Sequence, residues 1–190
     1  MSYKIAVFAS GTGSNTKNII DVFRDSEINV ALIVSNNPDA KVLDIAKVHD
    51  IPSIVINRKD LYHSGKFINY LIDENFDLIV LAGFLWLIPA DLIYFYNKKI
   101  INIHPALLPK YGGKGMYGMK VHEAVKKSGD SLSGITIHYV NENYDEGDII
   151  FQAQTDVLDT DSPEDIANKI HALEYRYFPE VIEKILKNKY

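Results

Sequence analysis

The sequence contains no cysteine among its 190 residues. This absence excludes a disulfide framework, a thiolate nucleophile and a zinc site built on sulfur, and it agrees with a reducing, cytoplasmic location. Long apolar runs are also missing, because the run from Leu78 to Ala90 has only 13 residues and contains Gly83 and Pro89. We therefore expect no membrane span, and no signal peptide, since Asn15 and other polar residues soon interrupt the first apolar stretch.

Basic residues are outnumbered, with 20 Lys and Arg against 25 Asp and Glu and a formal net charge of -5. This balance disfavours a nucleic-acid partner, which would need clustered cations to neutralise phosphates. Hydrophobic residues make up 47% and charged residues 24% of the chain, as in folded globular proteins. We expect one domain over residues 1–190 and substrates that are small molecules.

Apolar runs of strand length alternate with amphipathic helical patterns through the first two thirds of the chain. Such near-continuous Val, Ile and Leu strands separated by helices indicate a parallel sheet covered on both faces. The expected strands are residues 5–9, 30–34, 53–56, 78–82 and 99–103, and the expected helices are residues 15–24, 40–49, 65–74, 90–96 and 120–127.

The pattern changes toward the carboxyl terminus. Residues 134–140 alternate between apolar and polar side chains and are followed by a second run at 149–154, which predicts an antiparallel pair at the sheet edge. A closing helix is expected to begin at Ser162 as N-cap, with Pro163 at its first position and Asp165 three residues after the cap. The fold class is α/β, a mostly parallel Rossmann-like sheet with this antiparallel pair.

Asn102 and His104 lie two residues apart where an apolar strand ends, since Pro105 cannot donate to a sheet ladder. Two such residues share a face, and the carboxyl ends of strands in an open α/β sheet are where ligands bind. An amide donor beside an imidazole suits a carbonyl whose oxygen becomes an anion as an amine attacks it. The alternative is a core histidine that ties down a loop.

A glycine-containing loop, Ser10 to Asn15, follows the first strand and precedes a helix, a position that favours an anion. It is not a dinucleotide fingerprint, because Thr16 occupies the place of the third glycine, and it is not a Walker loop. Hydroxyl and amide side chains in this loop suit a single phosphate monoester. A tight turn that needs glycine for its dihedral angles is the alternative.

Four separated motifs together resemble the phosphoribosylglycinamide formyltransferase family, and the resemblance covers essentially the whole chain. They are Ser10-Gly11-Thr12-Gly13-Ser14-Asn15, Leu81-Ala82-Gly83-Phe84, Asn102-Ile103-His104-Pro105 with Leu107-Leu108-Pro109, and Asp145-Glu146-Gly147. The resemblance implies the formyltransferase fold and direct transfer of a formyl group from 10-formyltetrahydrofolate, as co-substrate, to the amine of phosphoribosylglycinamide in purine biosynthesis. It also implies a phosphate-binding half at residues 1–100 and a catalytic and folate-binding half at 101–190.

The resemblance assigns roles to individual positions. By position, the catalytic set is Asn102, His104 and Asp145; the phosphate site is Gly13, Ser14 and Asn15; the ribose and glycinamide contacts are Glu174 and Pro105; and the folate pocket is Leu85, Trp86, Leu87, Ile88, Asn102, Asn141, Glu142, Asn143, Tyr144 and Asp145. Taken alone, Asp145 reads as a turn residue and Glu174 as a solvated helix carboxylate.

The residues themselves agree with a reaction that uses no metal, because the sequence shows neither cysteine nor a recognisable metal triad. His104, protonated or nearly so, would donate to the formyl oxygen, Asn102 would add a second donor, and Asp145 would favour the charged imidazolium.

Two departures from the family pattern stand out. Trp86 occupies the place of an arginine that better-known members carry, which leaves the contact to the folate's glutamate tail open. Residues 112–118 contain four glycines, which fits either a flexible lid or an ordinary long loop, and Lys114 within them is a candidate supplement to the phosphate site.

Other functions remain open at this stage. Methionyl-tRNA formyltransferase resembles this chain around Asn102 and His104 but carries a further carboxyl-terminal domain. Formyltetrahydrofolate hydrolase usually carries a further amino-terminal domain, and a non-catalytic nucleotide-binding module would explain only the glycine loop. The sequence also leaves open another phosphorylated amine as acceptor, and a homodimer.

Overall fold

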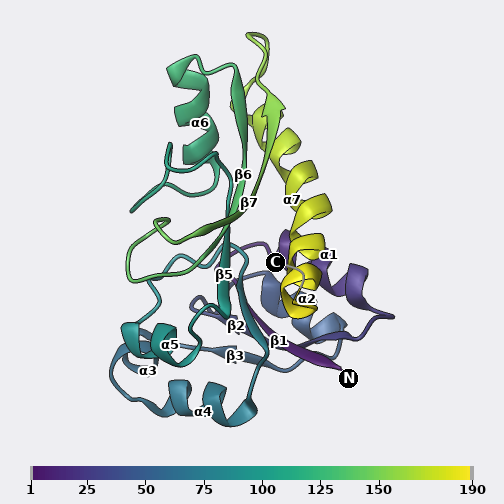
Figure 1. The fold of residues 1–190 in the computed structure, drawn as a ribbon, viewed down its shortest axis with the longest axis vertical. Coiled ribbons are helices and arrows are strands. Elements are labelled where there is room, and N and C mark those ends of the chain that lie inside the picture. The colour runs from purple at the N-terminus through teal and green to yellow at the C-terminus, as the bar shows by residue number, and fades with distance from the viewer. Residues whose placement is uncertain (1, 189–190) are drawn as a thin grey trace.

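A single seven-stranded sheet runs through the computed structural model, which describes residues 2–188 (Figure 1). The strand order is β3-β2-β1-β4-β5-β6-β7. Strands β1 to β5 pair in parallel, whereas β6 runs antiparallel to both β5 and β7. The strands are β1 (Tyr3–Phe8), β2 (Ile28–Ser35), β3 (Ser53–Val55), β4 (Leu78–Leu81), β5 (Ile100–His104), β6 (Leu132–Tyr139) and β7 (Ile149–Asp156).

Helices cover both faces of this sheet. Buried residues of α1, α2 and α7 pack in one hydrophobic cluster, and those of α3, α4 and α5 pack in the other. In Figure 1 the long helix α7 runs beside β6 and β7 and down toward α1. The helices are α1 (Ser14–Phe23), α2 (Val42–Val48), α3 (Arg58–Tyr62), α4 (Lys66–Glu74), α5 (Ala90–Phe95), α6 (Met119–Ser128) and α7 (Pro163–Leu186).

The four consecutive apolar residues of β1, residues 5–8, are all buried. Ile5 and Val7 are buried in the first cluster, whereas Ala6 and Phe8 are buried in the second. Successive side chains of a strand point to opposite faces, so a strand with helices on both sides must be apolar at every position. The expected α/β class, with a mostly parallel sheet and an antiparallel pair toward the carboxyl terminus, is confirmed.

Two details differ from the prediction. The strand expected at residues 99–103 is β5 (Ile100–His104), so His104 is the last strand residue and not the first loop residue. The reason is that β5 pairs with β6 as far as His104, opposite Thr136, before Pro105 ends the ladder. The short helix α3 was not predicted; it begins with a capping box between Asn57 and Asp60.

The start of α7 follows the prediction. The Ser162 side chain accepts from the Asp165 N–H, and the Asp165 carboxylate accepts from the Ser162 N–H. This capping box fixes where the helix begins. Further along, the Tyr175 carbonyl accepts from Asn18 Nδ2 at 2.8 Å, which joins α7 to α1. The last helix is thereby held beside the first one.

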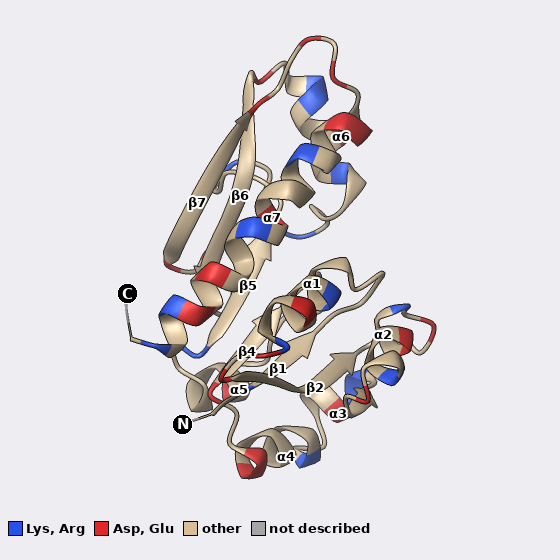
Figure 2. Cartoon of the chain, turned by 90° about the vertical axis from the view of Figure 1, so that its right-hand side faces the viewer, with Lys and Arg blue, Asp and Glu red and all other residues tan. Residues whose placement is uncertain are grey.

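Charged side chains lie mainly on the helices and loops, with both signs interspersed along α4 and α7 (Figure 2). Among the strand residues, only Lys4 and Asp156 are Lys, Arg, Asp or Glu. Within residues 2–188, no helix is both long enough and apolar enough to cross a membrane.

The carboxyl ends of β1, β4 and β5 meet at one edge of the sheet. The chain leaves β1 into the Ser10–Asn15 loop, leaves β4 into residues 82–86, and leaves β5 after His104. Strand order reverses around β1, because β2 lies on one side of it and β4 on the other. Ligands of open α/β sheets bind at such a point, so this edge is where a ligand cavity is expected.

Candidate active site

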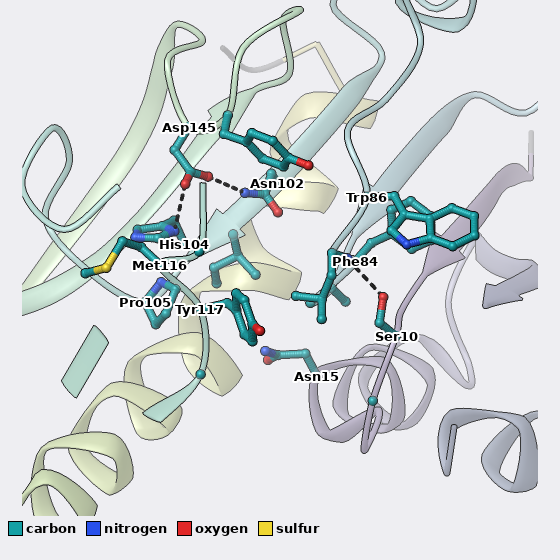
Figure 3. A pocket seen from close by; sticks show the side chains of 18 of the residues that line it. Ser10, Asn15, Phe84, Trp86, Asn102, His104, Pro105, Met116, Tyr117 and Asp145 are labelled. Carbon is teal, nitrogen blue, oxygen red and sulfur yellow. Dashed lines mark hydrogen bonds and ion pairs between the residues drawn. The ribbon is translucent and has the colours of Figure 1, made fainter. Parts of the chain in front are cut away.

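A cavity of about 610 Å³ lies at this edge. Its volume falls within the range of small-molecule sites, which is roughly 300–1,000 Å³. Its walls come from both halves of the chain: residues 10–15, Arg58, Tyr62 and 82–86 from the first hundred residues, and 102–105, 113–118, His122, Tyr144, Asp145, His171 and Glu174 from the rest. Figure 3 shows the side chains that face this space.

The glycine loop forms one end of the cavity. Gly13 is left-handed with φ 74°, and its carbonyl accepts from the Lys17 N–H at 2.8 Å, which begins α1. A Cβ at this position would lie 2.7 Å from Val42 Cγ2, so no side chain fits without displacing α2. The Ser10 hydroxyl is already engaged, because it accepts from the Leu85 N–H at 2.9 Å. The unpaired N–H groups of the first turn of α1 favour an anion here.

Asn15 and Glu174 meet beside this loop. Asn15 Nδ2 donates to Glu174 Oε2 at 2.9 Å, whereas Asn15 Oδ1 is buried with no partner among the described residues. Glu174 is only 5% exposed. Burial raises the pKa of Glu174 to about 7, against the hydrogen bond from Asn15, which lowers it. The cavity therefore contains a carboxyl group that exchanges its proton near neutral pH.

Asn102 lies in a hydrogen-bond network that fixes its orientation. His138 Nδ1 lies 2.8 Å from the Tyr139 carbonyl, which can only accept, so His138 carries its proton on Nδ1 and Nε2 is free to accept. Asn102 Nδ2 lies 3.1 Å from His138 Nε2 and 3.3 Å from Asp145 Oδ1. Both N–H groups of Asn102 are thus engaged, and the amide oxygen points away from Asp145 (Figure 3). This arrangement differs from the expected donor role of Asn102.

His104 is held from two sides. Its Nε2 lies 2.8 Å from the Tyr111 carbonyl and donates to it, and its Nδ1 lies 3.5 Å from Asp145 Oδ2. The second distance is longer than a good hydrogen bond, so Nδ1 is not fully engaged by Asp145. Asp145 Oδ2 accepts instead from the Gly113 N–H at 2.9 Å.

Burial and neighbouring groups act in opposite directions on the pKa of each member of this pair. Burial lowers the pKa of His104, even though Asp145 and the Tyr111 carbonyl raise it. Burial also raises the pKa of Asp145, but the contacts with His138, His104 and the Gly113 N–H together outweigh it and hold that pKa below its ordinary value. At neutral pH these shifts favour an ionised Asp145 and a neutral His104. The expectation of a nearly protonated imidazole therefore does not fit the surroundings of His104 in this structure.

An aromatic wall forms another side of the cavity. Phe84 and Trp86 follow β4 and have ring centroids 6.4 Å apart. Trp86 also lies near Tyr62, at 6.4 Å, and the Arg58 guanidinium lies 4.9 Å from the Trp86 ring centre. Flat apolar rings with one cation over the Trp86 ring suit a planar heterocycle that carries an acidic substituent.

The structure places most of the predicted site residues along this one cavity. The predicted residues that line it are Gly13, Ser14, Asn15, Leu85, Trp86, Asn102, His104, Pro105, Tyr144, Asp145 and Glu174. Lys114 and the other residues of 113–118 line it as well.

Five predicted residues do not line this cavity, namely Leu87, Ile88, Asn141, Glu142 and Asn143. Ile88 is 2% exposed and belongs to the hydrophobic core, and the Leu87 carbonyl accepts from the Tyr62 hydroxyl at 2.8 Å. Asn141 turns inward on its own loop, where its Oδ1 accepts from the Asn143 N–H. Their assignment to the folate pocket stays a prediction.

Several residues of the site were missed by the sequence analysis. The sequence signal for His138 is that it shares the polar side of the alternating run 134–140 with Thr136. In the structure it lies opposite Asn102 in the antiparallel pairing of β5 and β6. Arg58 and Tyr62 come from the unpredicted helix α3. His122 and His171 lie on α6 and α7, where nothing in the sequence marks them. His122 is 2% exposed, and burial lowers its pKa to about 4.

No group of three or more His, Asp or Glu side chains within residues 2–188 is arranged to hold a metal ion.

The sequence matches the model of the formyl transferase family over residues 3–182. It is 40% identical to the chloroplastic phosphoribosylglycinamide formyltransferase of Arabidopsis thaliana, a match that covers 98% of this chain and 66% of that protein. It is 38% identical to phosphoribosylglycinamide formyltransferase of Bacillus subtilis, covering 96% of this chain and 94% of that protein. The chain thus spans about two thirds of the length of the plant relative and nearly all of the bacterial one.

A solved structure is similar in fold as well as in sequence. The crystal structure of phosphoribosylglycinamide formyltransferase from Anaplasma phagocytophilum superposes with a TM-score of 0.89 at 34% sequence identity. The superposition covers 100% of this chain and 88% of that chain.

Proposed function

This chain belongs to the formyl transferase family, and we propose that it transfers the formyl group of 10-formyltetrahydrofolate to the amine of 5-phosphoribosylglycinamide, a step of de novo purine biosynthesis. The observation that carries this proposal is the placement of Asn102, His104 and Asp145 in the same cavity as the Gly11–Asn15 loop. A phosphorylated amine held by the loop would reach the catalytic set without any movement between domains.

We assign the acceptor to the end of the cavity at α1. Gly13, Ser14 and Asn15 would bind the phosphate, since the first turn of α1 offers N–H groups and a positive dipole end. Glu174 would accept from ribose hydroxyls, and Pro105 would contact the glycinamide. The unpartnered Asn15 Oδ1 supports this assignment, because a buried acceptor without a donor is costly unless a ligand supplies one.

We assign the donor to the aromatic wall. Leu85, Trp86 and Tyr144 would contact the folate ring system, and the Arg58 guanidinium over Trp86 is placed to meet an acidic substituent. Residues 1–100 would thus supply the phosphate loop and part of the donor wall, and residues 101–190 the catalytic groups. This division differs from the expected one, in which folate binding fell to the second half.

His104 would stabilise the charge that develops on the formyl oxygen. As the amine attacks, the new C–N bond forms and the carbonyl electrons move onto oxygen. That negative charge raises the proton affinity of the imidazole, so His104 would take up a proton from solvent at Nδ1 and donate a hydrogen bond through it to the oxyanion. His104 keeps this proton, so the carbonyl re-forms when the adduct collapses. The 3.5 Å gap to Asp145 leaves Nδ1 room for this second partner.

Asn102 and Asp145 would orient the attacking amine and assist the transfer of its proton. Because both N–H groups of Asn102 are engaged, its Oδ1 is available to accept an amine N–H and direct the nitrogen lone pair at the formyl carbon. The bond between the formyl carbon and N10 then breaks, and one amine proton moves to N10, so that the donor leaves as tetrahydrofolate. Asp145 would hold the imidazolium and the water that relays this proton.

An acceptor panel tests the proposal. Purified protein with 10-formyltetrahydrofolate is offered phosphoribosylglycinamide, its dephosphorylated riboside, methionyl-tRNA or no acceptor, and donor loss and N-formyl product are both followed. At low acceptor concentration we expect product with phosphoribosylglycinamide alone. The riboside should be formylated weakly. Donor loss at the same rate without acceptor would identify a hydrolase, and product only with tRNA would overturn the proposal.

A further inference from the structure

One short turn, residues 111–113, contacts both members of the His104–Asp145 pair through its main chain. The Tyr111 carbonyl accepts from His104 Nε2 at 2.8 Å, and the Gly113 N–H donates to Asp145 Oδ2 at 2.9 Å. Two residues apart in sequence, these groups fix the imidazole and the carboxylate at once. The geometry of the pair therefore depends on how firmly this turn is held.

The turn has a backbone conformation that needs outside support. Tyr111 has φ 57° and Gly113 has φ 92°. Glycine adopts such values freely, but a tyrosine in the left-handed region is uncommon and persists only where surrounding contacts hold it. Gly112 cannot be replaced easily, because a Cβ there would lie 2.6 Å from Leu108 Cδ2.

The support comes from the side chain of Tyr111, on the side away from the cavity. Its hydroxyl lies 2.9 Å from Asp130 Oδ2 and 2.6 Å from Ser128 Oγ. Ser128 donates its own proton to the Val125 carbonyl, and the Asp130 N–H donates to Ser128 Oγ, so the group is tied to the last turn of α6. Lys110 Nζ also lies 2.9 Å from Asp130 Oδ2. Tyr111 is the member of this group that belongs to the turn.

We propose that Tyr111 and Asp130 are positioning residues for catalysis, which hold the Tyr111 carbonyl against His104 Nε2 so that His104 Nδ1 faces the cavity and Asp145. The effect on turnover rests on the proposed function, whereas the effect on His104 itself does not. Neither side chain touches the substrate in this account. They act through the main chain of residues 111–113.

The consequence for His104 can be observed directly. With the carbonyl in place, the neutral imidazole carries its proton on Nε2; without it, the proton is better placed on Nδ1, where Asp145 accepts it. The titratable and charged groups around His104 are Asp145, His138 on β6 and His122 on α6. All three remain in a variant that loses only the tyrosine hydroxyl, so a change in tautomer reports on the carbonyl.

The test uses Tyr111→Phe, which keeps the ring and removes the hydroxyl, and Asp130→Ala, which removes the carboxylate acceptor and leaves Ser128 Oγ. ¹⁵N spectra of histidine-labelled protein, with the His104 signals assigned from His104→Gln, give the tautomer and the titration midpoint. We expect both variants to shift neutral His104 toward the Nδ1–H form and to lower kcat by about 3- to 10-fold with KM nearly unchanged, the size of one lost hydrogen bond.

Two further variants serve as controls. Asp130→Asn keeps an acceptor oxygen for the Tyr111 hydroxyl. It should restore most of the Nε2–H tautomer of His104 and most of the wild-type kcat. Lys110→Met removes only the exposed ion pair to Asp130 and should leave both readouts as in the wild type.

An unchanged His104 tautomer in both Tyr111→Phe and Asp130→Ala overturns the positioning role, as does an equal effect of Lys110→Met. If the wild type shows no formyl transfer, the proposed function fails while the ¹⁵N comparison still decides the positioning role. Folding is monitored by thermal unfolding of each variant, and should Tyr111→Phe not fold, the two Asp130 variants supply the comparison.

Discussion

Asn15 Nδ2 donates to Glu174 Oε2 at 2.9 Å across 159 positions of sequence. The bond joins the first turn of α1 to the middle of α7, and so the amino-terminal loop to the last helix. It also positions a buried carboxyl group whose pKa burial raises to about 7. A group of this kind makes both stability and ligand binding depend on pH in the neutral range.

Glu174→Gln should flatten the pH dependence of stability. The pKa of Glu174 is about 7 when folded and near 4.5 when unfolded, so the folded state binds the extra proton. The contribution of Glu174 to stability therefore falls as pH rises from about 4.5 to 7, and the variant lacks this contribution. The free energy of unfolding is measured with denaturant at pH 5 and at pH 8. Between these two values the variant should become more stable relative to the wild type by about 2 kcal/mol. A constant difference between the two proteins at both values would show that the carboxyl is not perturbed.

Gly13→Ala should weaken binding of the phosphorylated acceptor and leave binding of the folate donor unchanged. The new Cβ would lie 2.7 Å from Val42 Cγ2 in a left-handed residue, which must displace the loop that faces the anion. We expect KM for the phosphorylated acceptor to rise at least about fivefold. Gly65→Ala is the matched control, because Gly65 is also left-handed, with φ 64°, a Cβ there meets nothing within 4 Å, and the residue does not line the cavity. Equal loss of affinity for the folate would indicate general damage to the loop.

His104→Ala should lower turnover while both substrates still bind. The imidazole supplies charge stabilisation and proton transfer in the transition state, so kcat should fall on the order of 10² to 10⁴. Steady-state kinetics together with calorimetric binding separates this effect from a loss of affinity. Turnover close to that of the wild type would restore the alternative in which His104 only ties down a loop.

The fluorescence emission of Trp86 should change when the folate donor binds. Trp86 is the only tryptophan, it lines the cavity, and it lies between Tyr62, Phe84 and the Arg58 guanidinium. Saturation with a folate analogue should therefore change its emission, whereas inorganic phosphate should change it little. No response to an analogue that calorimetry shows to be bound would remove Trp86 from the donor wall.

The sequence was sufficient for the fold because its central parallel strands contain nearly continuous apolar runs. Ile5 to Phe8 bury side chains in both clusters, a pattern that only a strand covered on two faces requires. The capping box at Ser162 and Asp165 likewise marked the start of α7. Helix α3 was not predicted because it has only five residues, too few to show a helical period.

The site was less predictable, because most of its contacts join distant residues. The spacing of Asn102 and His104 could be read locally, but Asp145 lies 43 positions from Asn102 and came only from the family resemblance. The orientation of the Asn102 amide depends on His138, which in turn depends on the register of β5 and β6. The burial that lowers the pKa of His104 is a property of the packed site and has no signature in the sequence.

The most direct measurement follows the formyl carbon itself. The protein is mixed with ¹³C-formyl-labelled 10-formyltetrahydrofolate and phosphoribosylglycinamide, and the label is located by ¹³C NMR after the donor is consumed. We expect the label to appear in the N-formyl amide of the acceptor, in an amount equal to the donor lost, and we expect His104→Ala to slow this transfer. Label recovered as free formate, or a donor that persists in the presence of the acceptor, would contradict the proposed transfer.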